Sequence, residues 1–328
     1  MAQNNHPDSN HDENLPLSVD AYAVQRAIET LGYTYRAVGG VSEIDPAKSI
    51  DIAHSFWPHH HVAFSFATHN TRMLHIQGDI YGRLDLSAVG SVAKTVDEWN
   101  AERVGPTAYF TIADDASVHV HFRTSLAVAE PTSAVQLQSF IRTALESTTM
   151  AVDFFLHHHP ELGEAPSNLG NRFPQHYEQF PADSEIPTPL TVSRIVAGLS
   201  DVDIEIANST DVSAATWIND IFMGFYVETG PSLLVKGQWD TGCDAEREYM
   251  KLALICNQWN ENHPETKSFC VTDSDGLQLR VEYIADCGAG CTDGQLVLNI
   301  RLAIHCILAA IDYISVEFQG YCAVSWPE

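Results

Sequence analysis

Apolar and polar positions follow the same order in the two halves of the chain. Before Trp99-Asn100, and again before Trp259-Asn260, apolar residues recur at steps of three and four, which predicts an amphipathic helix. Each dipeptide is followed by two stretches of alternating polarity around an Asp-containing turn, which predict a β-hairpin. The four hairpin strands are expected at residues 109–113, 117–125, 268–272 and 277–285.

A long helix is predicted at the end of each half. Gln136-Leu137 in the first half returns as Gln295-Leu296 in the second, 159 residues later. Thr132-Ser133 and Thr292-Asp293 stand before these pairs and are expected to cap the helices. The tryptophans are 160 residues apart, so a single one-residue deletion connects the two registers. This agreement predicts an internal repeat.

The order of elements before the tryptophans is also shared. Each half is expected to begin with a helix, at residues 19–31 and 189–199, and to continue with three strands. These strands are expected at residues 33–38, 62–68 and 73–79 and at residues 202–207, 222–229 and 233–239. Short turns between consecutive strands favour antiparallel sheets with helices packed on one face. The sequence thus predicts an α+β fold of two tandem modules, each in the order α-β3-α-β2-α.

The modules are expected at residues 15–160 and 187–328. The polar residues 1–14 are predicted to form a disordered tail. Residues 161–186 contain Pro, Asn and Gly without periodicity and are predicted to be a linker.

Composition narrows the classes of partner. Hydrophobic residues make up 45% of the chain, so each half can bury a core. The net charge of -26 opposes binding to phosphate backbones and to anionic membranes. No signal peptide precedes the first module, and polar residues interrupt the apolar stretch near the C-terminus, so no membrane contact is expected. All 7 cysteines lie in the second half, which argues against a disulfide framework and favours a cytoplasmic location.

The motifs resemble those of a known family. The helix ending in Trp99-Asn100, the paired strands, and the Gln136-Leu137 helix with its aromatic pair are similar to the bacterial YbjN family of sensory transduction regulators. The resemblance extends to both modules. It implies the fold of type III secretion chaperones, with the order α-β3-α-β2-α, and it implies no catalytic residues. Two copies in one chain suggest that the halves imitate a chaperone homodimer.

The histidines raise the possibility of a metal site in the first module. His119 and His121 are two residues apart on a predicted strand and therefore share a face. Two histidine triplets, at residues 59–61 and 157–159, cannot direct three imidazoles at one ion from a regular element. Gln278 and Arg280 replace the histidine pair in the second module. Surface histidines, with residues 57–59 in an exposed loop, are therefore favoured over a metal site.

Cys287 and Cys291 form the one close cysteine pair and precede the last helix. A helix N-terminus can lower the pKa of a thiol, so a redox role is one interpretation. A flexible glycine loop with incidental thiols is the other. No second pair completes a zinc site.

The tryptophan dipeptides and the last helix have structural explanations. A buried Trp with a bonded N–H, followed by Asn as a helix C-cap, accounts for both dipeptides. The last helix is apolar around its whole circumference, which predicts packing on its own sheet and also on the other module or a second subunit. Its apolar positions include Ile300, Leu302, Ile304, Ile307, Leu308, Ile311 and Ile314.

The sequence indicates binding rather than catalysis. It lacks the GxSxG, Walker, GxGxxG and HExxH motifs, so an enzyme with an unrecognised site is the weakest alternative. We expect a non-catalytic, chaperone-like regulatory adaptor for a protein partner, with the two modules arranged as a pseudo-dimer. The chain is expected to be a monomeric pseudo-dimer or a homodimer. The alternative is a regulator that responds to a small ligand or a metal through the histidine-rich first module. No catalytic, cofactor-binding or metal-binding residue is assigned.

Overall fold

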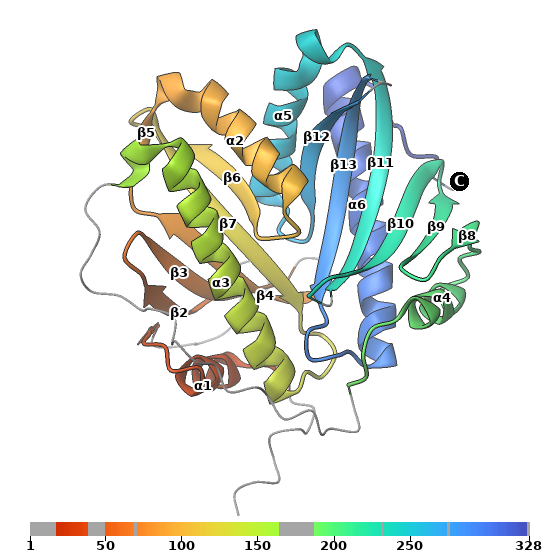
Figure 1. Ribbon diagram of the computed structural model, residues 1–328, viewed down its shortest axis with the longest axis horizontal. Coiled ribbons are helices and arrows are strands. Elements are labelled where there is room, and N and C mark those ends of the chain that lie inside the picture. The colour runs from red at the N-terminus through yellow and green to blue at the C-terminus, as the bar shows by residue number, and fades with distance from the viewer. Residues whose placement is uncertain are drawn as a thin grey trace, which may run out of the picture.

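The described residues form two antiparallel sheets, each with three α-helices (Figure 1). The computed structural model describes residues 18–38, 50–68, 71–163, 187–230, 232–273 and 276–326. The predicted tail and residues 164–186 of the predicted linker lie outside the described residues. The prediction of an α+β fold with antiparallel sheets is confirmed.

The first half contains one sheet and its helices. Its elements are α1 (Ala21–Thr30), β1 (Arg36–Ala37), β2 (Ile50–Phe56), β3 (His60–Thr68), β4 (Arg72–Ile80), β5 (Leu84–Asp85), η1 (Leu86–Ala88), α2 (Val89–Glu102), β6 (Thr107–Ile112), β7 (Ser117–Ala127), α3 (Ala134–His158) and η2 (Pro160–Gly163). The strand order is β1-β2-β3-β4-β7, and β7 also pairs with β5 and β6.

The second half has a sheet with a matching order of strands, β8-β9-β10-β11-β13-β12. Its elements are α4 (Val192–Ser200), β8 (Asn208–Ser209), β9 (Ser213–Ile218), β10 (Ile221–Glu228), β11 (Ser232–Cys243), α5 (Ala245–Asn262), β12 (Lys267–Asp273), β13 (Gly276–Asp286) and α6 (Asp293–Gln319).

The predicted hairpins and long helices are present, but the first strand of each half was wrongly placed. The prediction put strands at residues 33–38 and 202–207, whereas the long first strands are β2 and β9. Only two residues of 33–38 form a strand, β1. Val202, Ile204 and Ile206 alternate with polar residues, yet they pack against the core from a loop. Strand β9 was missed because its small residues carry little apolar pattern.

The expected exposed loop at residues 57–59 is also wrong. These residues form the tight turn between β2 and β3, and Trp57 is buried with its ring stacked on His60. An apolar side chain of this size is more stable in the core than in a solvated loop, and the sequence alone did not show which core would hold it.

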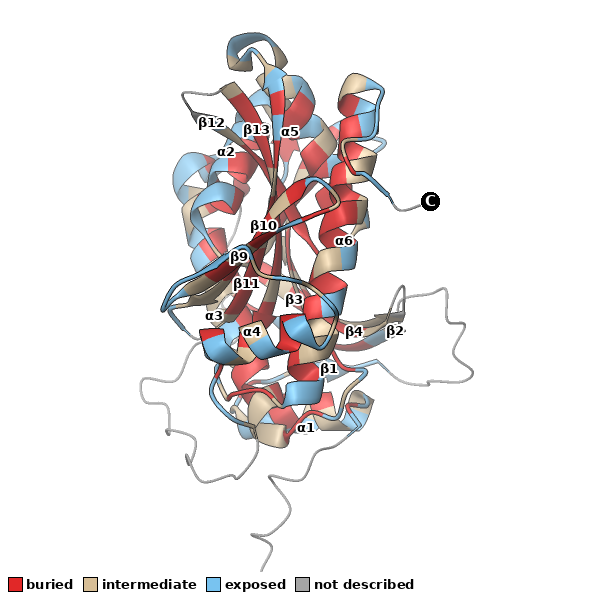
Figure 2. Ribbon diagram, turned by 90° about the vertical axis from the view of Figure 1, so that its right-hand side faces the viewer, coloured by how far each residue is buried: buried red, intermediate tan, exposed pale blue. Residues whose placement is uncertain are grey.

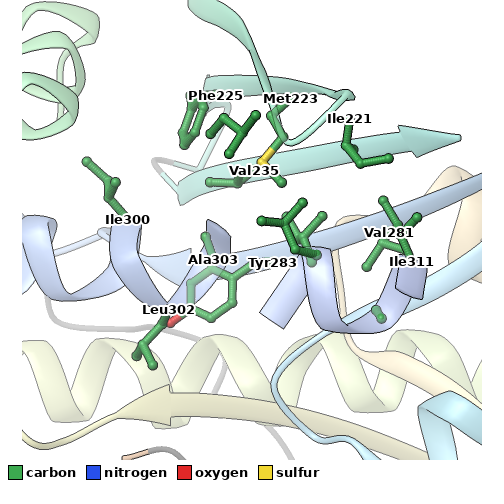
Figure 3. Close-up of a cluster of buried hydrophobic side chains, with 14 of the residues drawn as sticks. Ile221, Met223, Phe225, Val235, Val281, Tyr283, Ile300, Leu302, Ala303 and Ile311 are labelled. Atoms are coloured by element: carbon green, nitrogen blue, oxygen red, sulfur yellow. The ribbon is translucent and has the colours of Figure 1, made fainter. Parts of the chain in front are cut away.

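Each sheet buries one face under its helices (Figure 2). In the second half, Met223, Phe225 and Val235 lie opposite Ile300 and Ile311 of α6 (Figure 3). The same cluster includes Met73 and Ala127 of the first half, so buried residues of both halves pack together where the halves meet.

Helix α6 is the one helix in the described residues that is long and apolar enough to cross a membrane. Of its most apolar window, 56% is buried inside the protein, as in the core helix of a soluble domain. Its buried residues pack on β11 and β13.

A glycine on the central strand lets the last helix of each half approach its sheet closely. A Cβ at Gly78 would lie 2.4 Å from Thr148 Cγ2, and a Cβ at Gly237 would lie 2.2 Å from Ile307 Cγ2. Contacts this short force the helix away from the sheet, so both positions require glycine.

We predict that Gly237→Ala lowers the free energy of unfolding by roughly 1–3 kcal/mol because the added methyl group overpacks the core. The same change in an Ile307→Ala background should cost less, and urea unfolding of the four proteins measures the difference. Gly90→Ala is the control, because a Cβ there meets nothing within 4 Å. Equal costs for Gly237→Ala in both backgrounds would contradict this account of the packing.

Candidate functional site

The two halves exchange hydrogen bonds between a helix of one and an edge strand of the other. In the described residues, β6 pairs with β7 alone and β12 pairs with β13 alone. Helix α5 of the second half packs on β6, and helix α2 of the first half packs on β12. Asn257 of α5 accepts from the Phe110 N–H at 2.9 Å and donates to the Phe110 carbonyl at 3.0 Å. Asp97 of α2 accepts from the Cys270 N–H at 2.7 Å. Asp97 and Asn257 are 160 residues apart in the sequence, as are Cys270 and Phe110, so the contact is reciprocal.

Basic side chains cap the C-terminal ends of the same two helices. Arg123 of β7 donates to the carbonyls of Asn260 and Glu261 at the end of α5. Lys267 of β12 donates to the carbonyls of Arg103 and Val104 after α2. A cation at this end of a helix neutralises the partial negative charge of its free carbonyls.

The two cations occupy equivalent sites on different strands. In the first hairpin, Arg123 on β7 pairs in register with Thr107 on β6. In the second hairpin, Lys267 on β12 pairs in register with Glu282 on β13. The basic residue therefore lies on the second strand of one hairpin and on the first strand of the other. Burial lowers the pKa of Lys267, and the carboxylate of Glu282, 2.7 Å away, opposes this effect.

A pair of glutamines joins the N-terminal ends of the last helices. Gln136 donates to the side-chain oxygen of Gln295 at 2.9 Å and to the carbonyl of Gly290 at 2.9 Å. Gln295 donates to the carbonyl of Pro131 at 2.7 Å. The same glutamines complete the capping boxes of Ser133 and Thr292, which confirms the predicted N-caps.

The asparagine of each Trp-Asn dipeptide has a different role from the predicted one. Trp99 and Trp259 are buried and their indole N–H groups are bonded, as expected. Asn100, however, bonds the N–H and carbonyl of Ala108, and Asn260 bonds those of Ser268. The asparagines therefore fasten each helix to its own hairpin and are not C-caps.

A cavity of about 260 Å³ lies where the two halves meet. Both hairpins contribute equivalent residues to its wall, including Thr107 with Lys267 and Arg123 with Glu282, and α3 closes one side with Phe140, Ala144 and Ser147. Arg123 Nε and Thr124 Oγ1 are buried there and have no hydrogen-bond partner among the described residues. A buried donor without a partner is costly, which suits a site that a polar ligand can complete.

Buried carboxyl groups give this region a dependence on pH. Burial raises the pKa of Asp286, which lines the cavity, to about 6. The hydrogen bond from the Gly288 N–H and the positive charge of Arg142 act in the opposite direction and lower this pKa. Burial also raises the pKa of Asp97 to about 6, although the Cys270 N–H and the Tyr249 hydroxyl bond its oxygens. Folding therefore favours the protonated form of both groups.

The histidines of the described residues do not gather into one cluster. His61 and His121 both contact Asp79 on the open face of the first sheet, where His121 holds the pKa of Asp79 below its usual value against burial. His119 bonds Ser117 instead, and burial lowers the pKa of His60 to about 3. Within the described ranges, no group of three or more His, Cys, Asp or Glu side chains is arranged to hold a metal ion.

The second triplet is equally dispersed. His158 bonds the carbonyl of Phe154 in its own helix, and the buried His159 bonds the hydroxyl of Thr95. Cys287 and Cys291, by contrast, are buried side by side at the start of α6. The thiols are thus close enough to act as a pair.

We predict that Asp97→Asn removes a pH-dependent part of the stability. In the wild type, the stability from the raised pKa of Asp97 is fully present below about pH 3.8 and is lost as the pH rises through about 6. By linkage, the raised pKa of Asp97 contributes roughly 2–3 kcal/mol to the free energy of unfolding at low pH. The asparagine can still accept from the Cys270 N–H, because Asn257 accepts from the Phe110 N–H in the equivalent contact. The variant should therefore be more stable than the wild type at pH 8 and equal to it near pH 4.

Urea unfolding at several pH values measures this difference. Asn257→Asp is the matched control: its carboxylate loses the bond to the Phe110 carbonyl, and the variant should be less stable than the wild type at pH 8. Parallel stability curves for the wild type and Asp97→Asn between pH 4 and 8 would show that Asp97 is not the titrating group.

Comparison with known proteins points to one family for the first half. The model of the YbjN family, described as "Putative bacterial sensory transduction regulator", matches residues 23–157. A solved structure, titled "Crystal structure of YbjN, a putative transcription regulator from E. coli", is similar at 15% identity with a TM-score of 0.34, over 44% of this chain and 97% of that chain. No curated protein matches the sequence. Residues 23–157 are thus similar to a YbjN-family domain.

Proposed function

We propose that this protein is a non-catalytic regulator whose two halves form an intramolecular pseudo-dimer with a small-molecule site between them. The observation that carries the proposal is the cavity at the junction, with Arg123 in its wall and an unpartnered Nε–H on the same guanidinium.

The reciprocal contacts support the pseudo-dimer. Asp97 and Asn257 serve opposite edge strands, Arg123 and Lys267 serve opposite helix ends, and Gln136 and Gln295 bond one another. In each case the two partners exchange equivalent roles, which is the property of a twofold interface. The second half would thus be a second copy of the YbjN-like module in the first.

The size and lining of the cavity support a small ligand. Its volume of about 260 Å³ approaches the roughly 300 Å³ at which ligand pockets begin. Met73, Phe140 and Ile284 supply apolar surface, and Arg123 and Thr124 supply hydrogen-bonding groups. A ligand with an apolar body and a carboxylate or carbonyl oxygen fits this arrangement.

The regulatory part of the proposal agrees with the description of the YbjN family, which names a regulator and no reaction. In such a protein, a ligand at the junction would change the contact between the halves. It would therefore shift the population of any form in which that contact is altered.

A second candidate function, the binding of a protein segment, is favoured by the open face of the second sheet. Trp217 on β9 is 65% exposed and lies against Phe222, beside a hollow of about 350 Å³ that includes Tyr226 and Lys236. Aromatic and basic side chains of this kind anchor protein interfaces. Trp217→Ala separates the two candidates, since it should abolish capture of a protein partner and leave the junction cavity intact.

The small-molecule site is tested with benzoate, phenylacetate and benzamide as probes, detected by saturation-transfer NMR on the full chain. Ser147 lines the cavity and is only partly buried, so Ser147→Phe should fill the site and weaken binding at least tenfold. Met150→Phe, on the exposed side of the same helix, is the control and should bind as the wild type does.

A preference for the two carboxylates over benzamide would identify Arg123 as the polar contact. Absence of binding by all three probes at millimolar concentration, or equal binding by the Ser147→Phe variant, would overturn the proposed site.

A further inference from the structure

We propose that Cys287 and Cys291 are a peroxide-sensitive dithiol that closes to a disulfide at the start of α6. The proposal concerns a segment that the junction cavity does not require. It stands on the contact between the two sulfurs, the guanidinium beside one of them, and the contrast with a second cysteine pair in the same half.

The turn that joins the two cysteines holds their thiols together. The Gly290 N–H donates to the carbonyl of Cys287 at 2.8 Å, and Gly290 adopts a φ of 81° that favours glycine. Cys291 is bridged to Thr188 in antiparallel fashion. The turn brings the Cys287 thiol within hydrogen-bonding reach of Cys291.

A fixed cation lies beside Cys291. Arg194 Nη1 is 3.5 Å from the Cys291 sulfur, and the guanidinium is held by the Cys291 carbonyl and by Asp293. Cys291 also precedes Thr292, the N-cap of α6. The Cys287 thiol, and then Arg194, lower the pKa of Cys291 to about 7 against the opposing effects of burial and Asp293.

The pair Cys256 and Cys270 provides an internal comparison. These thiols are also in hydrogen-bonding contact, but the carboxyl group of Asp97 is their charged neighbour. The contact with Cys256, burial and Asp97 all raise the pKa of Cys270. Proximity is thus common to both pairs, whereas a cation lies beside Cys291 and a carboxyl group lies beside Cys270.

Access favours a small oxidant. Cys287 and Cys291 are each 4% exposed, and they line a hollow of about 30 Å³ together with Gln136 and Gln295. Such a volume holds about one water molecule. Hydrogen peroxide is close to this size, whereas glutathione disulfide is far larger.

The oxidation is balanced by one peroxide. The Cys291 thiolate attacks one peroxide oxygen, the O–O bond breaks, and the departing hydroxide takes a proton, which leaves a sulfenic acid on Cys291. The Cys287 sulfur then attacks the Cys291 sulfur. Its proton leaves with the displaced hydroxide as water, so two thiols and one peroxide give one disulfide and two waters.

The disulfide would act on the junction through the backbone of the turn. The carbonyl of Gly290, between the two cysteines, accepts the bond from Gln136 of the first half. Closing the ring restricts this segment and ties the position of that carbonyl to the redox state.

The test exposes the reduced full chain to hydrogen peroxide, alkylates the remaining thiols, and maps them by mass spectrometry after trypsin digestion. Cys287 and Cys291 fall in one peptide, residues 281–301, whereas Cys256 and Cys270 fall in two. We expect the 281–301 peptide to lose two hydrogens and both alkylation sites while Cys256 and Cys270 stay alkylated. An equal or faster loss of thiols at Cys256 and Cys270 would overturn the proposal.

Variants at Arg194 separate an electrostatic role from a structural one. Arg194→Gln should slow oxidation at pH 7 by roughly five- to tenfold and move the rise of the rate with pH toward the ordinary thiol range, near 8.5. Arg194→Lys keeps the charge and should retain most of the rate. If both variants slow the reaction equally and leave its pH profile unchanged, the guanidinium does not activate Cys291.

Discussion

The arrangement of the two halves depends on hydrogen bonds that bury the edges of both sheets. An edge strand presents unpaired N–H and carbonyl groups, and these need partners when they are removed from water. Asn257 satisfies both groups of Phe110, and Asp97 satisfies the N–H of Cys270. Each half therefore completes the polar groups of the other, and separating them would leave both edges exposed.

The remaining features of the junction follow from this exchange. Because α2 and α5 lie on the opposite edge strands, their C-terminal ends come within reach of Lys267 and Arg123. The hairpins of the two halves line a space that side chains do not fill, and this space is the cavity. The proposed ligand site is therefore a consequence of joining two similar halves and needs no separate element.

The sequence predicted the parts of the fold that have a strong local pattern. The helices before Trp99 and Trp259, the hairpins after them, and the capped last helices all follow from apolar periodicity and turn residues. Strands β2 and β9 were missed because their patterns are weak, and the alternation of Val202, Ile204 and Ile206 belongs to a packed loop.

The candidate site was harder to predict, since its residues act across a distance of about 160 positions. Asp97 and Asn257 look like ordinary polar positions on a helix, and Gln136 and Gln295 look like members of capping boxes. Their equivalent positions in the predicted repeat were visible, but their contact with the other half depends on tertiary geometry.

The most direct test of the junction is amide hydrogen exchange at Phe110 and Cys270, followed by NMR. If the halves complete each other's edges, both amides exchange as slowly as those of the central strands, and Asn257→Ala accelerates exchange at Phe110 in the other half by at least tenfold. Rapid exchange at Phe110 and Cys270 in the wild-type protein, as expected for solvated edge strands, would contradict the account.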